Sequence, residues 1–309
     1  MNIQNTLIEP GQSQAVRFNV GRLPSGTNIY LQVHAYRSKA PGPTVLFMAG
    51  LHGDEVNSVE IVRRAIASRM FEGLLCGAVL AVPLLNVYGF NNFSRDVPDG
   101  KDVNRSFPGT SSGSLASRVA YFFTKNILPQ IDFGVDFHTG GNSNYNYPQI
   151  RYSAGDARSE ELAAAFAAPF SIATAPIAKS LRRTALNAGR PIVVFEGGEN
   201  LRFDGFSIEK GLAGIRRLLH THGMLPAAPP SGKVVHIAHR TWVRAARPGI
   251  FCWSKSSGQQ VRQGEPLAMI SDPNGTDDLV VVSPKDGYII GHNNNPVVGV
   301  GDALFHIGS

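Results

Sequence analysis

An α/β fold followed by a small all-β region is the fold class that the sequence predicts, and three observations predict it. Strand-like and helix-like apolar runs alternate through most of the first 225 of the 309 residues, which is typical of a mixed, largely parallel sheet flanked by helices. A Pro/Ala stretch, PAAPPS at residues 226–231, then has the composition of a linker. Short strand-like segments broken by Gly, Pro and Asn follow it. Because the chain is long for one core, we expect two domains, residues 1–228 and residues 229–309.

The elements of the first domain follow from the period of the apolar residues. Strand-like segments at residues 15–20 and 29–37 flank the turn GRLPSG and predict a hairpin. Apolar runs predict further strands at residues 44–48, 77–83, 133–137 and 191–195, and helical patterns predict helices at residues 56–70, 114–128, 160–170 and 207–222. Parallel strands end at one edge of their sheet, so a functional site is expected at that edge.

The second domain is expected to be a barrel-like or sandwich-like β structure. Its strand-like segments include GIFCWS, PLAMIS, DLVVVS, GYIIGH and ALFHIG. Two of its phrases, SGQQVRQGEPLAMI and NPVVGVGDALFHI, share a V-x-x-G-[ED]-x-L pattern, which predicts two related hairpins.

Composition and charge exclude several classes of protein. Hydrophobic residues make up 43% and charged residues 17%, as in an ordinary globular protein. The net charge of +6 favours an anionic substrate, but the Arg pairs lie in helix-like stretches and no Lys/Arg run with interleaved aromatics is present, so no nucleic-acid partner is expected. No apolar run approaches membrane-spanning length, and no membrane partner is expected. The first residues lack the features of a secretory signal and the two cysteines lack metal-type spacing, which predicts a cytoplasmic protein without a disulfide framework.

A Gly-rich turn within MAGLHGDEVNSVEIVRR, residues 48–64, carries a histidine and two acids between an apolar strand and a helix. His52 and Glu55 are separated by two residues, so their side chains can converge above the end of the strand. An imidazole nitrogen and a carboxylate suit zinc, and a catalytic zinc takes three protein ligands and keeps a fourth position for water. Asp54 is expected to point elsewhere and to cap the helix.

The third ligand is expected to be His138, in VDFHTGG, because it too follows an apolar strand and precedes a Gly-Gly turn. Two strand ends in one parallel sheet bring such groups together although they are distant in the sequence. The other histidines, in the early hairpin, at the end of a helix and in the β tail, suit structural roles better. The sequence therefore predicts one zinc ion per chain, held by His52, Glu55 and His138.

Several motifs occur in an order that resembles the succinylglutamate desuccinylase/aspartoacylase family. They are GLHGDE, N-x-x-G-F at residues 86–90, Arg95, DVNRSFPG at residues 102–109, DFHTG, and FEGG at residues 195–198. The resemblance covers most of residues 44–220 and implies a fold and a site similar to those of the zinc carboxypeptidases. It also implies that the tail is the β-rich C-terminal domain of the family's two-domain members.

The resemblance implies a base that works beside the metal. When the family's motifs are carried over position by position, His52, Glu55 and His138 become the metal ligands. The resemblance makes Glu196 the general base, which takes a proton from a zinc-activated water and passes it to the departing amine. Glu199, in the same EGGE run, is the alternative.

The resemblance also implies how the substrate is bound. Arg95 would stabilise the developing oxyanion. Asn104 and Arg105 would bind a substrate carboxylate, a task suited to the planar guanidinium. Asp102 is expected to hold the loop or to orient an arginine rather than to take part in the chemistry.

Tyr145 and Tyr147 lie in GGNSNYNYPQIR, a polar and aromatic segment that is predicted to be a loop. Either side chain could line the pocket, and Tyr147 is the predicted substrate contact, although aromatic residues in loops also pack locally.

These inferences predict a zinc-dependent amidohydrolase, a deacylase that cleaves the amide bond of an N-acyl amino acid or a related carboxylate-bearing substrate. A zinc carboxypeptidase acting on peptide C-termini would use the same residues, and a non-catalytic ligand-binding relative would keep the fold; both stay open as alternatives. An acetylated diamino acid, a succinylated amino acid and N-acetylaspartate are all open as substrates. The β-rich tail leaves a homo-oligomer open.

Overall fold

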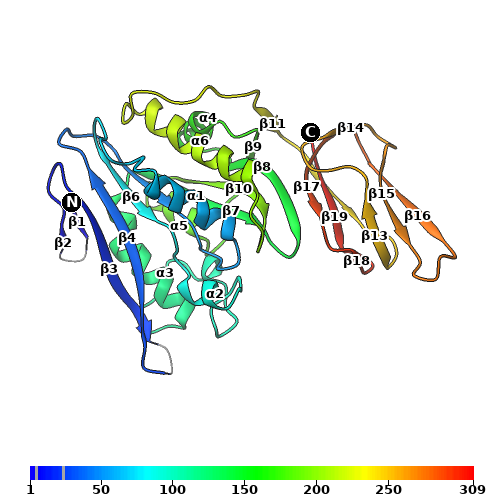
Figure 1. The fold of residues 1–309 in the computed structure, drawn as a ribbon, viewed down its shortest axis with the longest axis horizontal. Helices are drawn as coiled ribbons and strands as arrows, with labels where there is room; N and C mark the ends of the chain where they lie inside the picture. Colours follow the sequence, from blue (N-terminus) through cyan, green and yellow to red (C-terminus); the bar gives the residue numbers. More distant parts are fainter. Residues whose placement is uncertain (4–5, 23–24) are drawn as a thin grey trace.

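The computed structural model describes residues 1–3, 6–22 and 25–309 of the protein. A helix-flanked sheet forms the larger part of an elongated molecule, and the C-terminal strands, orange to red in Figure 1, form its other end. None of the helices within the described stretches combines the length and the hydropathy of a bilayer span.

The strands before the linker are β1 (Asn2–Ile3), β2 (Thr6–Leu7), β3 (Ser13–Arg22), β4 (Asn28–Arg37), β5 (Thr44–Met48), β6 (Ala78–Val82), β7 (Phe133–Gly140), β8 (Asn144–Ser153), β9 (Phe170–Thr174) and β10 (Ile192–Glu199). The α-helices are α1 (Val56–Ala67), α2 (Val87–Asn91), α3 (Leu115–Asn126), α4 (Ala157–Phe166), α5 (Leu181–Asn187) and α6 (Gly205–Thr221), and short 3₁₀ turns are η1 (Val103–Arg105) and η2 (Leu128–Gln130). The strands after the linker are β11 (Val235–Ile237), β12 (Arg240–Arg244), β13 (Gly249–Trp253), β14 (Gln260–Val261), β15 (Pro266–Ser271), β16 (Asp278–Val282), β17 (Gly287–Asn293), β18 (Val297–Val298) and β19 (Ala303–Gly308).

One mixed sheet, of 13 strands among the described residues, carries the site. The order along its main path is β12-β19-β17-β8-β10-β7-β5-β6-β4-β3. Strand β5 pairs in parallel with β6 and β7, and β10 pairs in parallel with β7. The pairs β3–β4 and β8–β10 are antiparallel. The predicted fold class, a mixed sheet flanked by helices with an all-β C-terminal region, is confirmed, and the parallel pairs that the sequence predicts form its centre.

Helices cover both faces of this sheet because its central strands are apolar on both sides. In β5, Leu46 and Met48 belong to a core with residues of α3 and α5, whereas Val45 and Phe47 belong to a core with residues of α1, α4 and α6. All four side chains are fully buried. A strand buried on both faces is a continuous apolar run, which is why the sequence predicts this one so directly.

The linker does not interrupt the sheet. Strand β17 pairs antiparallel with β8, and β11 pairs in parallel with β9, so two strands from beyond the linker extend the sheet of the first region. The strands β16, β15, β13 and β18 form a separate four-stranded sheet, and a third hydrophobic core lies within the C-terminal region. Figure 1 shows β17 and β19 between β8 and this outer sheet.

Several predicted helices run past their observed ends, and for two of them the backbone shows why. The helix predicted at residues 56–70 ends at Ala67, and Arg69 has a φ of 56°, a left-handed conformation that ends a right-handed helix. The helix predicted at residues 160–170 is α4, which ends at Phe166 because Ala167 is left-handed, with a φ of 53°.

The loop predicted after His138 is wrong, since residues 144–153 form β8. This strand pairs with β10 on one side and with β9 and β17 on the other. Its polar residues hid it, because they face a site rather than an apolar core. The predicted hairpin is present as the antiparallel pair β3–β4, and residues 23–24 of its turn lie outside the described residues.

Candidate active site and metal centre

The turn between β5 and α1 places His52 and Glu55 at the edge of the sheet. Gly50 has a φ of 61°, which favours glycine. At Gly53 a Cβ atom would stand 2.0 Å from the backbone of α2, so only glycine lets that helix lie against the turn. The two glycines therefore fix the path of the chain that presents the histidine and the glutamate.

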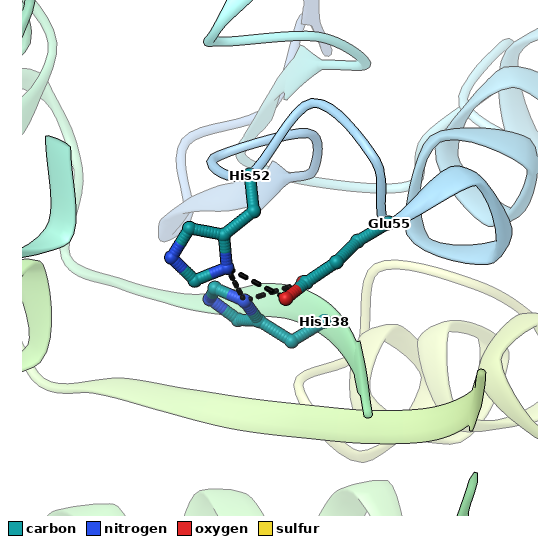
Figure 2. A group of neighbouring side chains, drawn as sticks. All are labelled: His52, Glu55 and His138. Carbon is teal, nitrogen blue, oxygen red and sulfur yellow. Dashed lines mark hydrogen bonds and ion pairs between the residues drawn. The ribbon is translucent and has the colours of Figure 1, made fainter. Parts of the chain in front are cut away.

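His52, Glu55 and His138 converge in a buried group, as Figure 2 shows. The Glu55 carboxylate lies 2.7 Å from His52 Nδ1 through Oε1 and 2.8 Å from His138 Nδ1 through Oε2. The two Nδ1 atoms are 3.2 Å apart. A tetrahedral zinc with bonds of about 2.0–2.1 Å separates its ligand atoms by about 3.3 Å. The Nδ1–Nδ1 distance is close to this separation, whereas the two distances to the carboxylate are shorter, as in hydrogen-bonded side chains. The donor types and their convergence therefore fit a metal ion such as zinc, and the structure brings together the three residues that the sequence singled out.

Further polar contacts orient this group. Asp136 Oδ2 lies 2.8 Å from His138 Nε2, so the other ring nitrogen of His138 faces Glu55. The backbone N–H of Thr139 donates to Glu55 Oε2 at 3.1 Å. Metal-binding histidines commonly use their second nitrogen in this way, with a carboxylate as the partner.

Electrostatics at the group favour positive charge. Burial would lower the pKa of His138, but the carboxylates of Asp136 and Glu55 outweigh it and raise that pKa well above its ordinary value. Burial would likewise raise the pKa of Glu55, but His52 and His138 outweigh it and hold that pKa below its ordinary range. A divalent cation would supply the positive charge that these carboxylates favour.

Asp54 does not cap α1, so that prediction is wrong. The N-cap residue is Glu55, which makes no side-chain capping hydrogen bond. The Asp54 carboxylate instead accepts a hydrogen bond from Asn200 Nδ2 at 2.9 Å and thus ties the turn to the segment after β10.

Arg95 lies beside the group and is held by Asp102. Its Nη2 donates to Asp102 Oδ2 at 2.9 Å, while its Nη1 lies 3.2 Å from His52 Nδ1. Asp102 Oδ1 also accepts from the backbone N–H of Asn104 at 2.6 Å. Asp102 therefore orients both the arginine and the loop, which are the two roles expected for it.

Asn104 and Arg105, in η1, line a cavity that is also lined by His52, Glu55 and His138. Asn104 Oδ1 accepts from the backbone N–H of Leu181 at 3.0 Å, so Asn104 also fixes the start of α5. Arg105 donates to the Asn104 carbonyl at 2.8 Å and keeps a side chain that is 45% exposed. That guanidinium can therefore still bind a ligand.

Glu196 lies beside His138, because the two are register partners in the parallel strands β10 and β7. Its Oε1 forms an ion pair with Arg151 Nη1 at 2.9 Å, and its Oε2 accepts a hydrogen bond from Asn146 Nδ2 at 2.7 Å. Glu196 lines the cavity. Glu199, the alternative base, accepts from Asn294 Nδ2 at 2.6 Å and is directed towards the C-terminal strands.

The cavity that joins these side chains has a volume of about 310 Å³. It is lined by His52, Glu55, Arg95, Asn104, Arg105, Asp136, His138, Thr139, Gly140, Gly141, Asn144, Asn146, Arg151, Ile177, Ser180, Arg182, Val194, Glu196 and Trp242.

Sequence reasoning did not single out several of these lining residues, among them Arg151, Arg182 and Trp242. Burial and the nearby charge of Arg151 lower the pKa of Arg182 to about 10, and its buried Nη1 has no hydrogen-bond partner among the described residues. The Arg182-Arg183 pair resembled a solvated helix face, although Ser180 caps α5 and could have marked its start. No local signal distinguished Trp242, which comes from β12 beyond the linker.

Tyr147, the predicted substrate contact, lines a different cavity. Its ring lies 5.2 Å from that of Phe170 and 5.4 Å from that of Phe206, so it takes part in local aromatic packing. The position of Tyr147 therefore gives no support to that prediction. Tyr145 donates a hydrogen bond to Asp204 Oδ2 at 2.6 Å, which is also a structural contact.

The fold and this site define a class of protein, an α/β protein with a buried His/Glu/His group able to hold a metal ion at the strand ends. The sequence profile of the Succinylglutamate desuccinylase/Aspartoacylase catalytic domain matches residues 41–222. The chain therefore belongs to the succinylglutamate desuccinylase/aspartoacylase family, whose members include deacylases that hydrolyse amide bonds.

Similar proteins cover nearly the whole chain. The N-alpha-acetyl-L-2,4-diaminobutyric acid deacetylase of Halomonas elongata is 28% identical over 285 residues, which are 86% of this chain and 82% of that protein. A succinylglutamate desuccinylase/aspartoacylase from Rhodobacter sphaeroides has a crystal structure with a TM-score of 0.87 and 26% identity, covering 100% of this chain and 99% of that one. The product-bound ectoine utilization protein EutE (DoeB) from Ruegeria pomeroyi, 23% identical, shares the fold, with a TM-score of 0.87 over 99% of this chain and 98% of that one.

Proposed function

We propose that this chain is a zinc-dependent amidohydrolase that removes the acyl group from an N-acyl amino acid or a similar carboxylate-bearing amide. The observation that carries the proposal is the convergence of His52, Glu55 and His138 in one cavity that also contains a carboxylate and several arginines. Membership of a family that includes deacylases supports the reaction type.

His52, Glu55 and His138 would hold the metal, and neighbouring side chains would transfer the proton and stabilise the developing charge. When bound, zinc supplies a Lewis acid that polarises the amide carbonyl and lowers the pKa of a water molecule to about 7. Glu196 takes a proton from the attacking water and delivers it to the nitrogen of the departing amine. Arg95, whose Nη1 lies 3.6 Å from Glu55 Oε1, stabilises the negative charge that develops on the carbonyl oxygen.

Two further arginines that line the cavity, Arg105 and Arg182, would bind the substrate carboxylate. Arg105 presents an exposed guanidinium, and Asn104 holds both that loop and the start of α5. Arg182 joins them in this proposal, because its Nη1 is buried without a hydrogen-bond partner in the described part of the chain, and a substrate carboxylate would supply one.

The size of the cavity favours a small amide over a peptide. Its volume of about 310 Å³ is near the lower end of the range of about 300–1,000 Å³ for ligand pockets. Trp242, from the C-terminal strands, forms part of its wall. We propose residues 1–228 as the catalytic domain and residues 229–309 as a domain that completes this wall.

We also propose that the protein works in the reducing cytoplasm. Cys76 and Cys252, both within the described residues, are free thiols, which supports this location.

The test is amine release from a panel of substrates by the zinc-loaded protein and by the chelated apoprotein. The panel contains N-acetyl-L-aspartate, N-succinyl-L-glutamate, N-alpha-acetyl-L-2,4-diaminobutyrate, the substrate named for the Halomonas relative, and dipeptides. We expect release from one N-acyl amino acid with zinc and none without it. Faster release from dipeptides would favour the carboxypeptidase alternative. No release from any member, with one zinc bound per chain, would contradict the proposal and favour a ligand-binding relative.

A further inference from the structure

The proposed base is held on both of its oxygens by one strand, β8. Arg151 and Asn146 each contact a different oxygen of Glu196, at 2.9 and 2.7 Å. β8 pairs antiparallel with β10 and includes the register pair Glu196–Gln149, so these contacts come from the strand next to the base. A carboxylate offers about four lone-pair positions, which leaves Glu196 free to accept a proton while both contacts persist.

Arg151 is itself held by a buried side chain of the same strand. Its Nε donates to Gln149 Oε1 at 3.3 Å, and Gln149 is fully buried. The Nε2 of Gln149 donates to the carbonyl of Ile290 in β17, also at 3.3 Å. The guanidinium is therefore oriented by a buried amide that is anchored to a strand from beyond the linker.

We propose that Arg151 is a positioning residue, which holds the Glu196 carboxylate at the angle from which it faces the cavity beside His138. The inference rests on the proposed function, in which Glu196 is the base. Without Arg151, the terminal torsion of the glutamate side chain is broad and keeps only the hydrogen bond from the neutral amide of Asn146, because the ion pair that fixes Oε1 is lost.

A role in binding the substrate carboxylate is less suited to Arg151 than to Arg182. The Nη1 and Nε groups of Arg151 already have partners, Glu196 and Gln149. Arg182 has a buried Nη1 without one in the described part of the chain. Arg151 thus has partners within the protein, whereas Arg182 keeps a donor for a ligand. We therefore expect loss of Arg151 to lower kcat and loss of Arg182 to raise KM.

The experiment compares the zinc-loaded wild type with Arg151→Met, Arg151→Lys and a control, Arg244→Met, at an arginine of β12 that donates to the Gly301 carbonyl. We expect Arg151→Met to lower kcat about 10- to 100-fold with KM changed less than about 2-fold, since a misplaced catalytic group costs rate rather than binding. Arg151→Lys restores part of kcat because a cation remains, and the control matches the wild type. Zinc content stays at one per chain in all four proteins.

Two results would overturn the inference while the proposed function stands: a raised KM with unchanged kcat, which would make Arg151 a substrate-binding residue, or Arg151→Met kinetics equal to those of the wild type. Crystal structures of the wild type and Arg151→Met give a second readout that needs no turnover. We expect the Glu196 carboxylate to turn away in the variant, and an unchanged carboxylate would contradict the positioning role. If the wild type cleaves no amide, the proposed function fails, and the crystal structures alone decide whether Arg151 positions Glu196.

Discussion

The regions before and after the linker bury their strands in different ways. Every residue of β7 is buried, whereas three of the five residues of β16 are exposed. In the first region, a polar residue at the end of a strand stands out against an apolar run, as His138 does. In the second, polar residues alternate with apolar ones on strands that have a solvent face, and a single polar residue there carries little information.

The two regions also contribute different residues to the candidate site. The residues that could hold a metal, the proposed base and the arginines all come from the first region. The second contributes Trp242 to the cavity wall and supports β8 through the pairing of β17. The comparison predicts that substitutions at the metal group and the base reduce the metal affinity or the rate, and that substitution of Trp242 in the second region affects substrate binding alone.

The largest expected effect is that of Glu196→Gln. The amide cannot take up the proton, so we expect kcat to fall about 10²- to 10⁴-fold while zinc stays bound. Steady-state kinetics with metal analysis measures both. The matched control is Glu265→Gln, a glutamate of the second region paired with Lys255 at 2.7 Å, which should leave kcat unchanged. An active Glu196→Gln protein would show that the base lies elsewhere.

Asp136→Asn should have a smaller effect, on metal affinity. The variant keeps the shape of the side chain that contacts His138 Nε2 but removes its charge. We expect the zinc affinity to fall about 10- to 100-fold, as for other carboxylates behind a metal-binding histidine. Competition against a chromogenic chelator measures it. Asp278→Asn, on the exposed side of β16, is the control, and equal zinc affinity in the two variants would argue against His138 as a ligand.

Trp242→Ala should have the smallest effect, on KM. The indole stacks on the His306 ring, with 4.1 Å between the ring centroids, and it lines the cavity. Its removal therefore opens part of the cavity wall. If the indole contributes about 1 kcal/mol to substrate binding, KM should rise about 5-fold at nearly constant kcat. Trp253→Ala is the control, since its indole donates to Asn294 Oδ1 and lies outside the cavity lining. A fall in kcat with constant KM would show that the second region acts on the chemistry itself.

Much of the fold was predictable because the central strands are buried on both faces. Strand β5 was predicted at its observed bounds from an apolar run. Strand β8 was missed because its Asn146 and Gln149 serve Glu196 and Arg151, so its pattern is neither apolar nor alternating. The end of α1 was missed because it depends on the left-handed backbone of Arg69, which the residue type does not favour.

By itself, the sequence determined the family, the alternation of strands and helices, and the three residues of the candidate metal centre. These residues could be found because each lies at or just beyond the end of an apolar strand, and parallel strands share one edge. Only the tertiary structure decided that Arg151 contacts Glu196, that Arg182 opens into the cavity, that Trp242 lines it and that Tyr147 does not. Those contacts depend on the order of strands in the sheet and on side-chain directions across it, and local patterns of hydrophobicity encode neither.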